Sequence, residues 1–153
     1  MALTLTSPAF ANNDVIPVQY TCDGDNISPP LNWSGVPEDT AELVLIVEDP
    51  DGVGGTMVHW VLFGFGSASG GLEEGKVPAG GLGGKNDFGR TDWAGPCPPY
   101  GIARPHRYTF TLLALSEPSG LAEGASPRKD LPYALSGKVL AQAQLTGKYA
   151  RRR

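Results

Sequence analysis

The chain has 153 residues, with 12 lysines and arginines against 16 aspartates and glutamates, so we expect one acidic domain over residues 1–153. This balance excludes the basic face that nucleic acid requires, and the arginines at 151–153 are interpreted as a solvated tail. With 41% apolar residues, the 21 glycines and 14 prolines indicate an ordered, loop-rich fold.

Four segments have the alternating or apolar character of β-strands. They are LTLTS at 3–7, ELVLIVE at 42–48, TMVHWVLFGF at 56–65 and HRYTFTLLAL at 106–115. The second and third are apolar on both faces, which favours central strands of two stacked sheets. The Gly/Pro-rich stretches at 66–84 and 86–105 exceed ordinary loop lengths, so we expect them to carry function or to be mobile.

One helix is predicted near the end of the chain, with Asp130 as its N-cap and Pro132 in its first turn. It is expected to continue at helical spacing through Leu135, Val139, Leu140 and Ala143 and to close near Gly147. The predicted fold class is therefore mainly β, a two-sheet antiparallel β-sandwich with a short C-terminal helix.

Localisation and redox state follow from what the sequence lacks. No apolar run reaches the roughly 18 residues that span a bilayer. The start MALTLTSPAF lacks the basic and apolar regions of a secretory signal. We therefore expect a cytoplasmic protein without stable membrane association. Cys22 and Cys97 are too few for a disulfide framework and are predicted to be free thiols.

The first candidate site lies between the second and third predicted strands. Asp49 opens a turn of sequence DPDG, and His59 enters the next strand. If the strands pair, both side chains lie at one end of the sheet, where the carboxylate can hold the imidazole in one tautomer. A buried histidine satisfied by a turn carboxylate is the structural alternative, and both stay open.

The second candidate site is the run GPCPPYG at 95–101 with the strand that follows it. In that strand His106 and Tyr108 share a face with Phe110. The prolines leave few N–H groups, but those of Gly95 and Cys97 are predicted to be available to an anion. Prolines that only cap a sheet edge are the alternative.

The remaining motifs do not indicate an enzyme. The segment CDGDNISPPLNW at 22–33 is interpreted as a structural loop, because its spaced acids lack the downstream glutamate of a calcium loop. Nucleophile-elbow, P-loop, dinucleotide and zinc-protease motifs are missing, so we assign no catalytic residue, metal or cofactor. A metal site of Asp49, His59 and His106 remains a minor alternative.

Three stretches together resemble one known family. TCDGDNISPPLNWSGVP, VEDPDGVGGTMVHWVLFGF and GKNDFGRTDWAGPCPPYG, followed by HRYTFTLLAL, closely resemble the phosphatidylethanolamine-binding protein family. The likeness is to its short prokaryotic, Raf kinase inhibitor-like branch and runs from about Leu3 to Tyr149. It implies a β-sandwich with a small cavity at one end for phosphate, phosphoryl head groups or carboxylates.

The resemblance assigns ligand-binding residues by motif. The family's D-P-D-x motif, strand histidine, proline turn and H-R-Y motif imply a ligand site of Asp49, His59, Gly95, Cys97, Pro98, Pro99, His106 and Tyr108. A carboxylate beside a bound anion repels it unless an imidazolium offsets the charge, so binding should strengthen as pH falls. The loop at 101–105 looks longer than in many short members and is expected to place Arg104 at the cavity mouth. The C-terminal segment with which longer eukaryotic members close the pocket is expected to be lacking.

We therefore predict a non-enzymatic protein that binds a small phosphorylated or carboxylated ligand, with a signalling or inhibitory role. The alternative is a protein inhibitor of a kinase or serine protease that acts through the Gly/Pro loops. A third interpretation is a hydrolase or lyase that uses Asp49, His59 and His106 as acid and base. A homodimer is a further prediction, because sandwich edges can pair.

Overall fold

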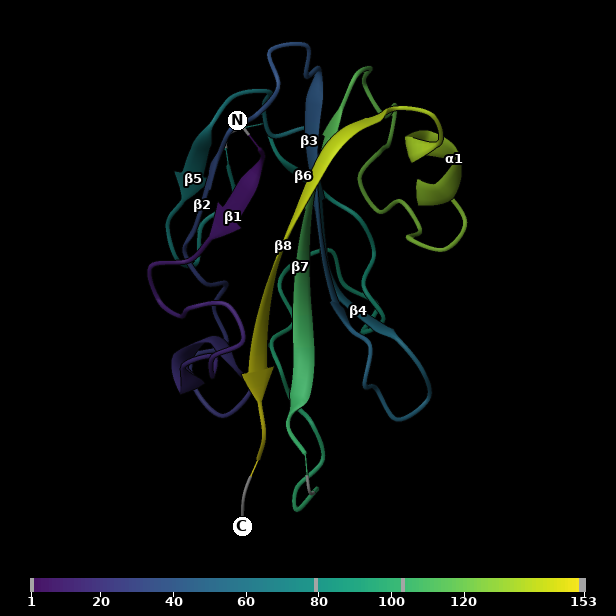
Figure 1. Cartoon of the computed structure of the whole chain (residues 1–153). Helices are drawn as coiled ribbons and strands as arrows, with labels where there is room; N and C mark the ends of the chain where they lie inside the picture. The colour runs from purple at the N-terminus through teal and green to yellow at the C-terminus, as the bar shows by residue number, and fades with distance from the viewer. Residues whose placement is uncertain (1, 79, 103, 152–153) are drawn as a thin grey trace.

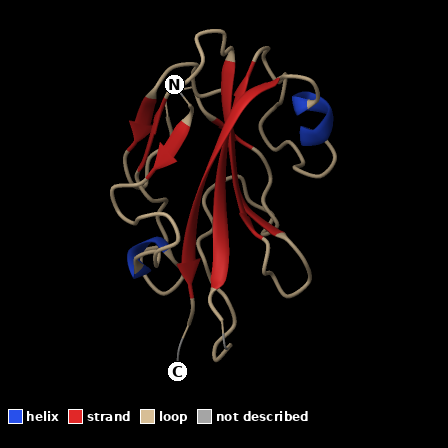
Figure 2. Cartoon of the chain, in the orientation of Figure 1, coloured by secondary structure: helices blue, strands red, loops and turns tan. Residues whose placement is uncertain are grey.

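The computed structural model, which describes residues 2–78, 80–102 and 104–151, contains two antiparallel sheets (Figures 1 and 2). The smaller sheet has the order β1 (Thr4–Thr6), β2 (Leu31–Ser34) and β5 (Gly70–Leu72). The larger sheet has the order β6 (Leu82–Gly83), β4 (Met57–Phe63), β3 (Glu42–Asp49), β7 (His106–Leu115) and β8 (Val139–Tyr149). The predicted two-sheet architecture is confirmed.

Both faces of the larger sheet are covered by apolar side chains. On one face Trp60 and Phe110 belong to the core that includes Leu31 of the smaller sheet. On the other face Val44 and Phe63 belong to a second cluster that includes residues 125 and 131. Burial on both faces explains why β3 is apolar from residue 43 to 47 and why β4 is apolar except at His59. Both are central strands, and they are neighbours in the same sheet.

The short C-terminal helix is confirmed, but its predicted extension is wrong. Helix α1 (Leu131–Leu135) follows Asp130, and the chain then turns at Gly137, whose φ is +72°. Residues 139–149 form β8, in which Leu145, Gly147 and Tyr149 alternate as buried positions. The apolar spacing used to predict a helix also suits a strand, and the alternation further along the chain is what distinguishes them. A single 3-10 turn, η1 (Val18–Tyr20), lies earlier in the chain.

Antiparallel pairing brings the ends of three strands together at one end of the larger sheet. β3 ends at Asp49, β7 begins at His106 opposite Tyr149, and β8 ends there (Figure 1). The N-terminal segment runs beside the same end of the sheet. The Ile16 N–H donates to the Lys148 carbonyl at 2.8 Å, and the Lys148 N–H donates to the Asp14 carbonyl at 2.9 Å. The candidate site lies at this end of the sheet.

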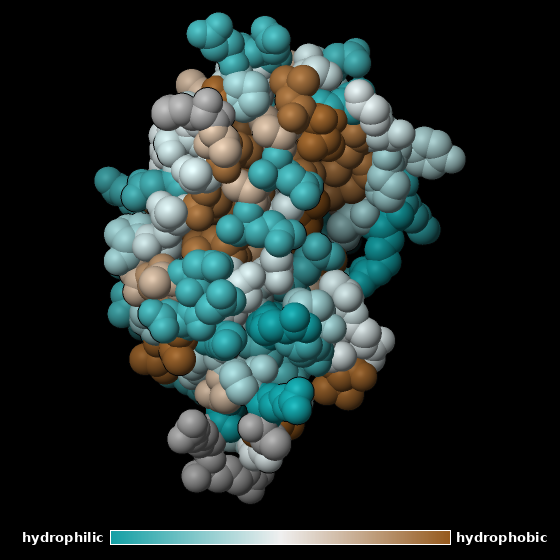
Figure 3. Space-filling view, in the orientation of Figure 1, coloured by the Kyte–Doolittle hydropathy of each residue, from teal (hydrophilic) through white to brown (hydrophobic). Residues whose placement is uncertain are grey.

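Apolar side chains also reach the surface in small areas. Figure 3 shows them in brown among hydrophilic residues in teal. Val139 and Leu140 at the start of β8, which were predicted to lie in the helix, are 43% and 45% exposed. Within the described part of the chain, no helix has the length and apolar character needed to cross a membrane.

Candidate functional site

A buried carboxylate–imidazole pair lies at the centre of the candidate site. Asp49 Oδ2 lies 2.7 Å from His106 Nδ1, and the two residues are 3% and 8% exposed. The pairing follows from topology, because β3 and β7 are hydrogen-bonded neighbours and Glu48 stands opposite Thr109, which brings the end of β3 beside the start of β7. The carboxylate therefore fixes the orientation of the His106 ring.

The predicted pairing of Asp49 with His59 is not what the structure contains. The β3–β4 register passes from Val47 opposite Trp60 to Glu48 opposite Val58, so His59 is the extra residue of a β-bulge. Its Nδ1 instead donates to the Ala94 carbonyl at 2.6 Å. Burial lowers the pKa of His59, an effect that the Ala94 carbonyl and the charge of Asp49 partly oppose.

Aromatic rings connect the two histidines. The Tyr108 ring lies 5.2 Å from the His59 ring and 6.5 Å from the His106 ring, measured between centroids. Burial, with a further contribution from the Asp49 charge, raises the pKa of Tyr108 well above its usual range, so the phenol keeps its proton. Phe88, which sequence reasoning missed, is 45% exposed and contacts His59 at 5.1 Å between centroids. The structure thus brings together two imidazoles, a neutral phenol and a carboxylate.

The proline-rich turn contributes differently from what we expected. The Gly95 N–H donates to Asn26 Oδ1 at 2.9 Å, so its predicted availability to an anion is wrong. The Cys97 N–H is directed at the Tyr108 hydroxyl and partly offsets the effect of burial on its pKa. Pro98 is buried whereas Pro99 is exposed. The turn therefore supports the site through Tyr108 and is itself held by the loop at 22–33, as the structural interpretation of that loop predicted.

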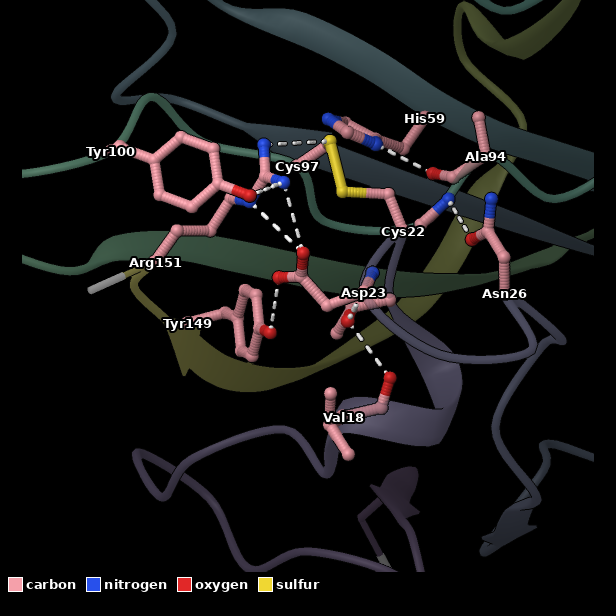
Figure 4. Close-up of a disulfide and its surroundings, with 12 residues drawn as sticks. Val18, Cys22, Asp23, Asn26, His59, Ala94, Cys97, Tyr100, Tyr149 and Arg151 are labelled. Atoms are coloured by element: carbon pink, nitrogen blue, oxygen red, sulfur yellow. Dashed lines mark hydrogen bonds and ion pairs between the residues drawn. A yellow bond between two sulfur atoms is a disulfide. The ribbon is translucent and has the colours of Figure 1, made fainter. Parts of the chain in front are cut away.

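The predicted free thiols are wrong. Cys22 and Cys97 form a disulfide, with their Cα atoms 5.4 Å apart (Figure 4). Beside it, the Cys22 N–H donates to the Pro96 carbonyl at 3.1 Å. A count of two cysteines cannot reveal this, because 75 residues of sequence separate them and only the fold brings them together. The bond ties the turn at 95–99 to the loop that begins at Cys22.

A polar cluster surrounds the disulfide and includes an arginine that we expected in a solvated tail. The Arg151 guanidinium forms an ion pair with Asp23 at 2.9 Å and contacts the Tyr100 hydroxyl (Figure 4). Tyr149 donates to the other Asp23 oxygen at 2.6 Å. The tail interpretation is therefore wrong for Arg151, while positions 152–153 lie outside the described residues. Sequence reasoning missed this cluster because its members are far apart along the chain.

A second ion pair lies just outside the buried one. Asp51 accepts from the Arg107 guanidinium at 2.9 and 3.0 Å and from the Arg107 backbone N–H at 2.9 Å. Chiefly through the side-chain hydrogen bonds, Arg107 lowers the pKa of Asp51 to about 2. Both residues line a groove of about 720 Å³, which is also bordered by His106 and Arg104; whether Arg104 reaches the mouth of the ligand cavity stays a prediction.

The Arg107→Ala variant is expected to raise the pKa of Asp51 from about 2 towards its ordinary value of 3.8. Because the folded-state pKa is the lower one, the Asp51 interaction stabilises the protein above about pH 4, and that contribution is lost as pH falls towards 2. An NMR titration of the Asp51 carboxyl carbon measures the shift. Arg90→Ala, which removes the partner of Asp92, is the control and should leave Asp51 unchanged. An Asp51 pKa that stays near 2 in Arg107→Ala would contradict the assignment.

The metal alternative receives no support from the geometry. Among the residues that the structure describes, no group of three histidine, cysteine, aspartate or glutamate side chains is arranged to hold a metal ion. Asp49 contacts His106, whereas His59 is turned to the Ala94 carbonyl. Asp49 and His106 are hydrogen-bonded to each other, and ring contacts through Tyr108 link His106 to His59; these four residues are called the wall below.

The fold and this wall define a class of β-sandwich proteins with a polar site at one end of the larger sheet. The family model described as phosphatidylethanolamine-binding protein matches residues 6–150, and the chain belongs to this family. A protein named UPF0098 protein from Methanothermobacter thermautotrophicus is 45% identical over 97% of this chain and 99% of its own. The crystal structure of Escherichia coli YbcL, described as a new member of the mammalian PEBP family, is 30% identical. It covers 98% of this chain and 99% of its own, with a TM-score of 0.89.

Proposed function

We propose that this chain binds a small anionic ligand, a phosphate, a phosphoryl head group or a carboxylate, at the wall formed by Asp49, His59, His106 and Tyr108. The observation that carries the proposal is the juxtaposition of two imidazoles with a neutral phenol at ring separations of 5.2 and 6.5 Å. Family membership supports a ligand-binding role. The assignment of Gly95, Cys97, Pro98 and Pro99 to direct ligand contact remains a prediction, and we propose that the first two act by holding the turn.

Each histidine uses Nδ1 for a protein partner, and we propose that Nε2 takes the ligand. His59 uses Nδ1 for the Ala94 carbonyl, and His106 uses Nδ1 for Asp49. Nε2 of each ring accepts a hydrogen bond when the imidazole is neutral and donates one when it is protonated. An anion therefore favours the protonated rings. An imidazolium at His106 also offsets the negative charge of Asp49, which would otherwise repel the ligand.

Anion binding should consequently strengthen as pH falls. Because burial lowers the pKa of His59, this ring is neutral in the ligand-free protein at neutral pH. Binding must supply the free energy of protonation there, and this cost falls as pH falls towards the pKa of the ring. We expect affinity for phosphorylethanolamine to be about tenfold higher at about pH 6 than at about pH 8, equivalent to about 1.4 kcal/mol.

Calorimetric titration with phosphorylethanolamine at these two pH values tests the proposal. The wild type should bind more tightly at the lower pH, and His59→Ala should lose binding at both. Tyr133→Ala is the matched control, because this aromatic residue is 88% exposed on α1, away from the wall. Equal affinity in the wild type and His59→Ala would overturn the proposed site.

The same variant separates the alternatives. Inhibition of a kinase or serine protease that persists in His59→Ala would favour the surface loops as the functional element. Turnover that disappears in His59→Ala or His106→Ala would instead favour a hydrolase or lyase. In that case Cys97 cannot be the nucleophile while its sulfur is bonded to Cys22.

The cytoplasmic location stays a prediction, and two findings weigh against it. Disulfides persist mainly in oxidising compartments, and this fold contains one. A Mycobacterium tuberculosis protein, LppC, is named as a candidate lipoprotein and is 45% identical over 96% of this chain and 72% of its own. Determining the redox state of Cys22 and Cys97 in whole cells by thiol labelling addresses the question directly.

A further inference from the structure

The groove beside His106 has a charge that differs from that of the whole protein. Arg104, Arg107 and Lys148 line it, while Asp51 is its acidic residue. The chain as a whole carries a formal net charge of −4, so this gathering of cations is local. Ile102 and Pro105 add apolar surface to the lining of the groove.

Strand pairing places two of these cations side by side. Arg107 in β7 stands directly opposite Lys148 in β8, so their side chains leave the sheet on the same face. Like charges at directly opposite positions repel each other. Asp51 offsets the charge of Arg107 through its two hydrogen bonds to the guanidinium. The charge of Lys148 is left without such an offset.

Lys148 and Arg104 supply the uncompensated charge of the groove. Within the described ranges, neither the Lys148 ammonium nor the Arg104 guanidinium has an ion-pair or hydrogen-bond partner. Lys148 is half-buried and Arg104 is exposed. Apolar walls lower the local dielectric and strengthen the attraction for an anion that enters. Two unpaired cations beside a neutralised Arg107–Asp51 pair match a dianionic group.

We propose that this groove is a second anion-binding site, in which Lys148 and Arg104 bind a phosphate group. It differs from the wall of Asp49, His59, His106 and Tyr108, because Lys148 and Arg104 lie outside that wall and only His106 borders both. A phosphate monoester carries a charge of about −1.5 to −2 at neutral pH, which matches the two cations. The groove site does not depend on the proposed function, since neither Lys148 nor Arg104 belongs to the wall.

The test uses the full ¹⁵N-labelled chain, with inorganic phosphate as the probe and sodium chloride to hold ionic strength constant. We expect saturable shifts of the backbone amide signals of Arg107 and Lys148. Lys148→Gln, which keeps most of the length of the side chain and removes its charge, should weaken phosphate binding about tenfold, the effect of losing one charge-assisted contact. Lys129→Gln, at an exposed lysine outside the groove, is the matched control and should bind phosphate as the wild type does.

Each outcome decides between the two sites. Shifts that do not saturate, or that weaken equally in Lys148→Gln and Lys129→Gln, would overturn the groove site. Phosphate binding lost in His59→Ala but kept in Lys148→Gln would overturn it and leave the proposed function standing. Phosphate binding that is lost in Lys148→Gln but kept in His59→Ala supports the groove as the phosphate site and contradicts the wall in that role. A melting temperature equal to that of the wild type confirms that Lys148→Gln is folded.

A second arm identifies the source of the phosphate group. Sedimentation with phosphatidylcholine vesicles, with and without phosphatidic acid, presents the same chemistry on a lipid. Binding to phosphatidic acid vesicles that is lost in Lys148→Gln assigns the groove to a lipid head group. Binding of inorganic phosphate without vesicle binding assigns it to a free phosphorylated molecule.

Discussion

The double variant Cys22→Ser/Cys97→Ser is expected to unfold with a free energy about 4 kcal/mol lower than that of the oxidised protein. The Cys22–Cys97 bond joins residues separated by 75 positions, and it therefore removes many conformations from the unfolded chain. A loss of this size is a large fraction of the stability of an ordinary domain. Urea unfolding followed by tryptophan fluorescence measures it.

Reduction of the wild type provides the control for this prediction. In the presence of a strong reductant, the wild type should unfold like the serine variant, and the reductant should leave the variant unchanged. The ion pair of Arg151 with Asp23 remains possible in both proteins, so the difference reports on the covalent bond. Unchanged stability on reduction would show that the unfolded chain gains little freedom.

The second large effect is expected for Gly95→Ala. A methyl group on Gly95 would lie 2.3 Å from Asn26 Oδ1 and 2.4 Å from the Tyr20 carbonyl oxygen. The first atom accepts the Gly95 N–H, and the second accepts the indole N–H of Trp93. Both acceptors must move, so we expect a loss of about 1 to 3 kcal/mol from overpacking, with a further loss from the weakened hydrogen bonds.

Gly54→Ala is the matched control for this substitution, because a methyl group on Gly54 would meet no heavy atom within 4 Å and its φ is not in the left-handed region. Thermal unfolding of both variants gives the comparison. Gly95→Ala should also weaken ligand binding, since Gly95 precedes the turn that supports Tyr108. Wild-type stability in Gly95→Ala would mean that the loop at 22–33 yields readily, and would contradict its proposed supporting role.

Local sequence pattern was sufficient for β1, β3, β4 and β7, whereas β2, β5 and β6 were not predicted and β8 was predicted as helix. The apolar runs that became β3 and β4 and the HRY motif at the start of β7 placed Asp49, His59, His106 and Tyr108 at strand ends. The partner of Asp49 could not be predicted, because it depends on which strand lies on each side of β3 and on the bulge at His59.

The errors elsewhere have the same origin. Val139 and Leu140 satisfy helical spacing, yet β7 supplies a strand partner that the local pattern does not include. The disulfide and the Arg151 cluster also join distant segments, as does the hydrogen bond from Gly95 to Asn26. Residue type indicated what chemistry the site contains, whereas long-range pairing decided which groups meet.

The position of β8 bears on how the chain is made. This strand, the last in the sequence, covers the edge of β7 and carries the hydrogen bonds of the N-terminal segment at Asp14 and Ile16. On the ribosome, therefore, the segment at Asp14 and Ile16 gains these partners only after β8 has been synthesised. Until then β7 presents an open edge to other nascent chains, an aggregation hazard that favours rapid completion or chaperone protection.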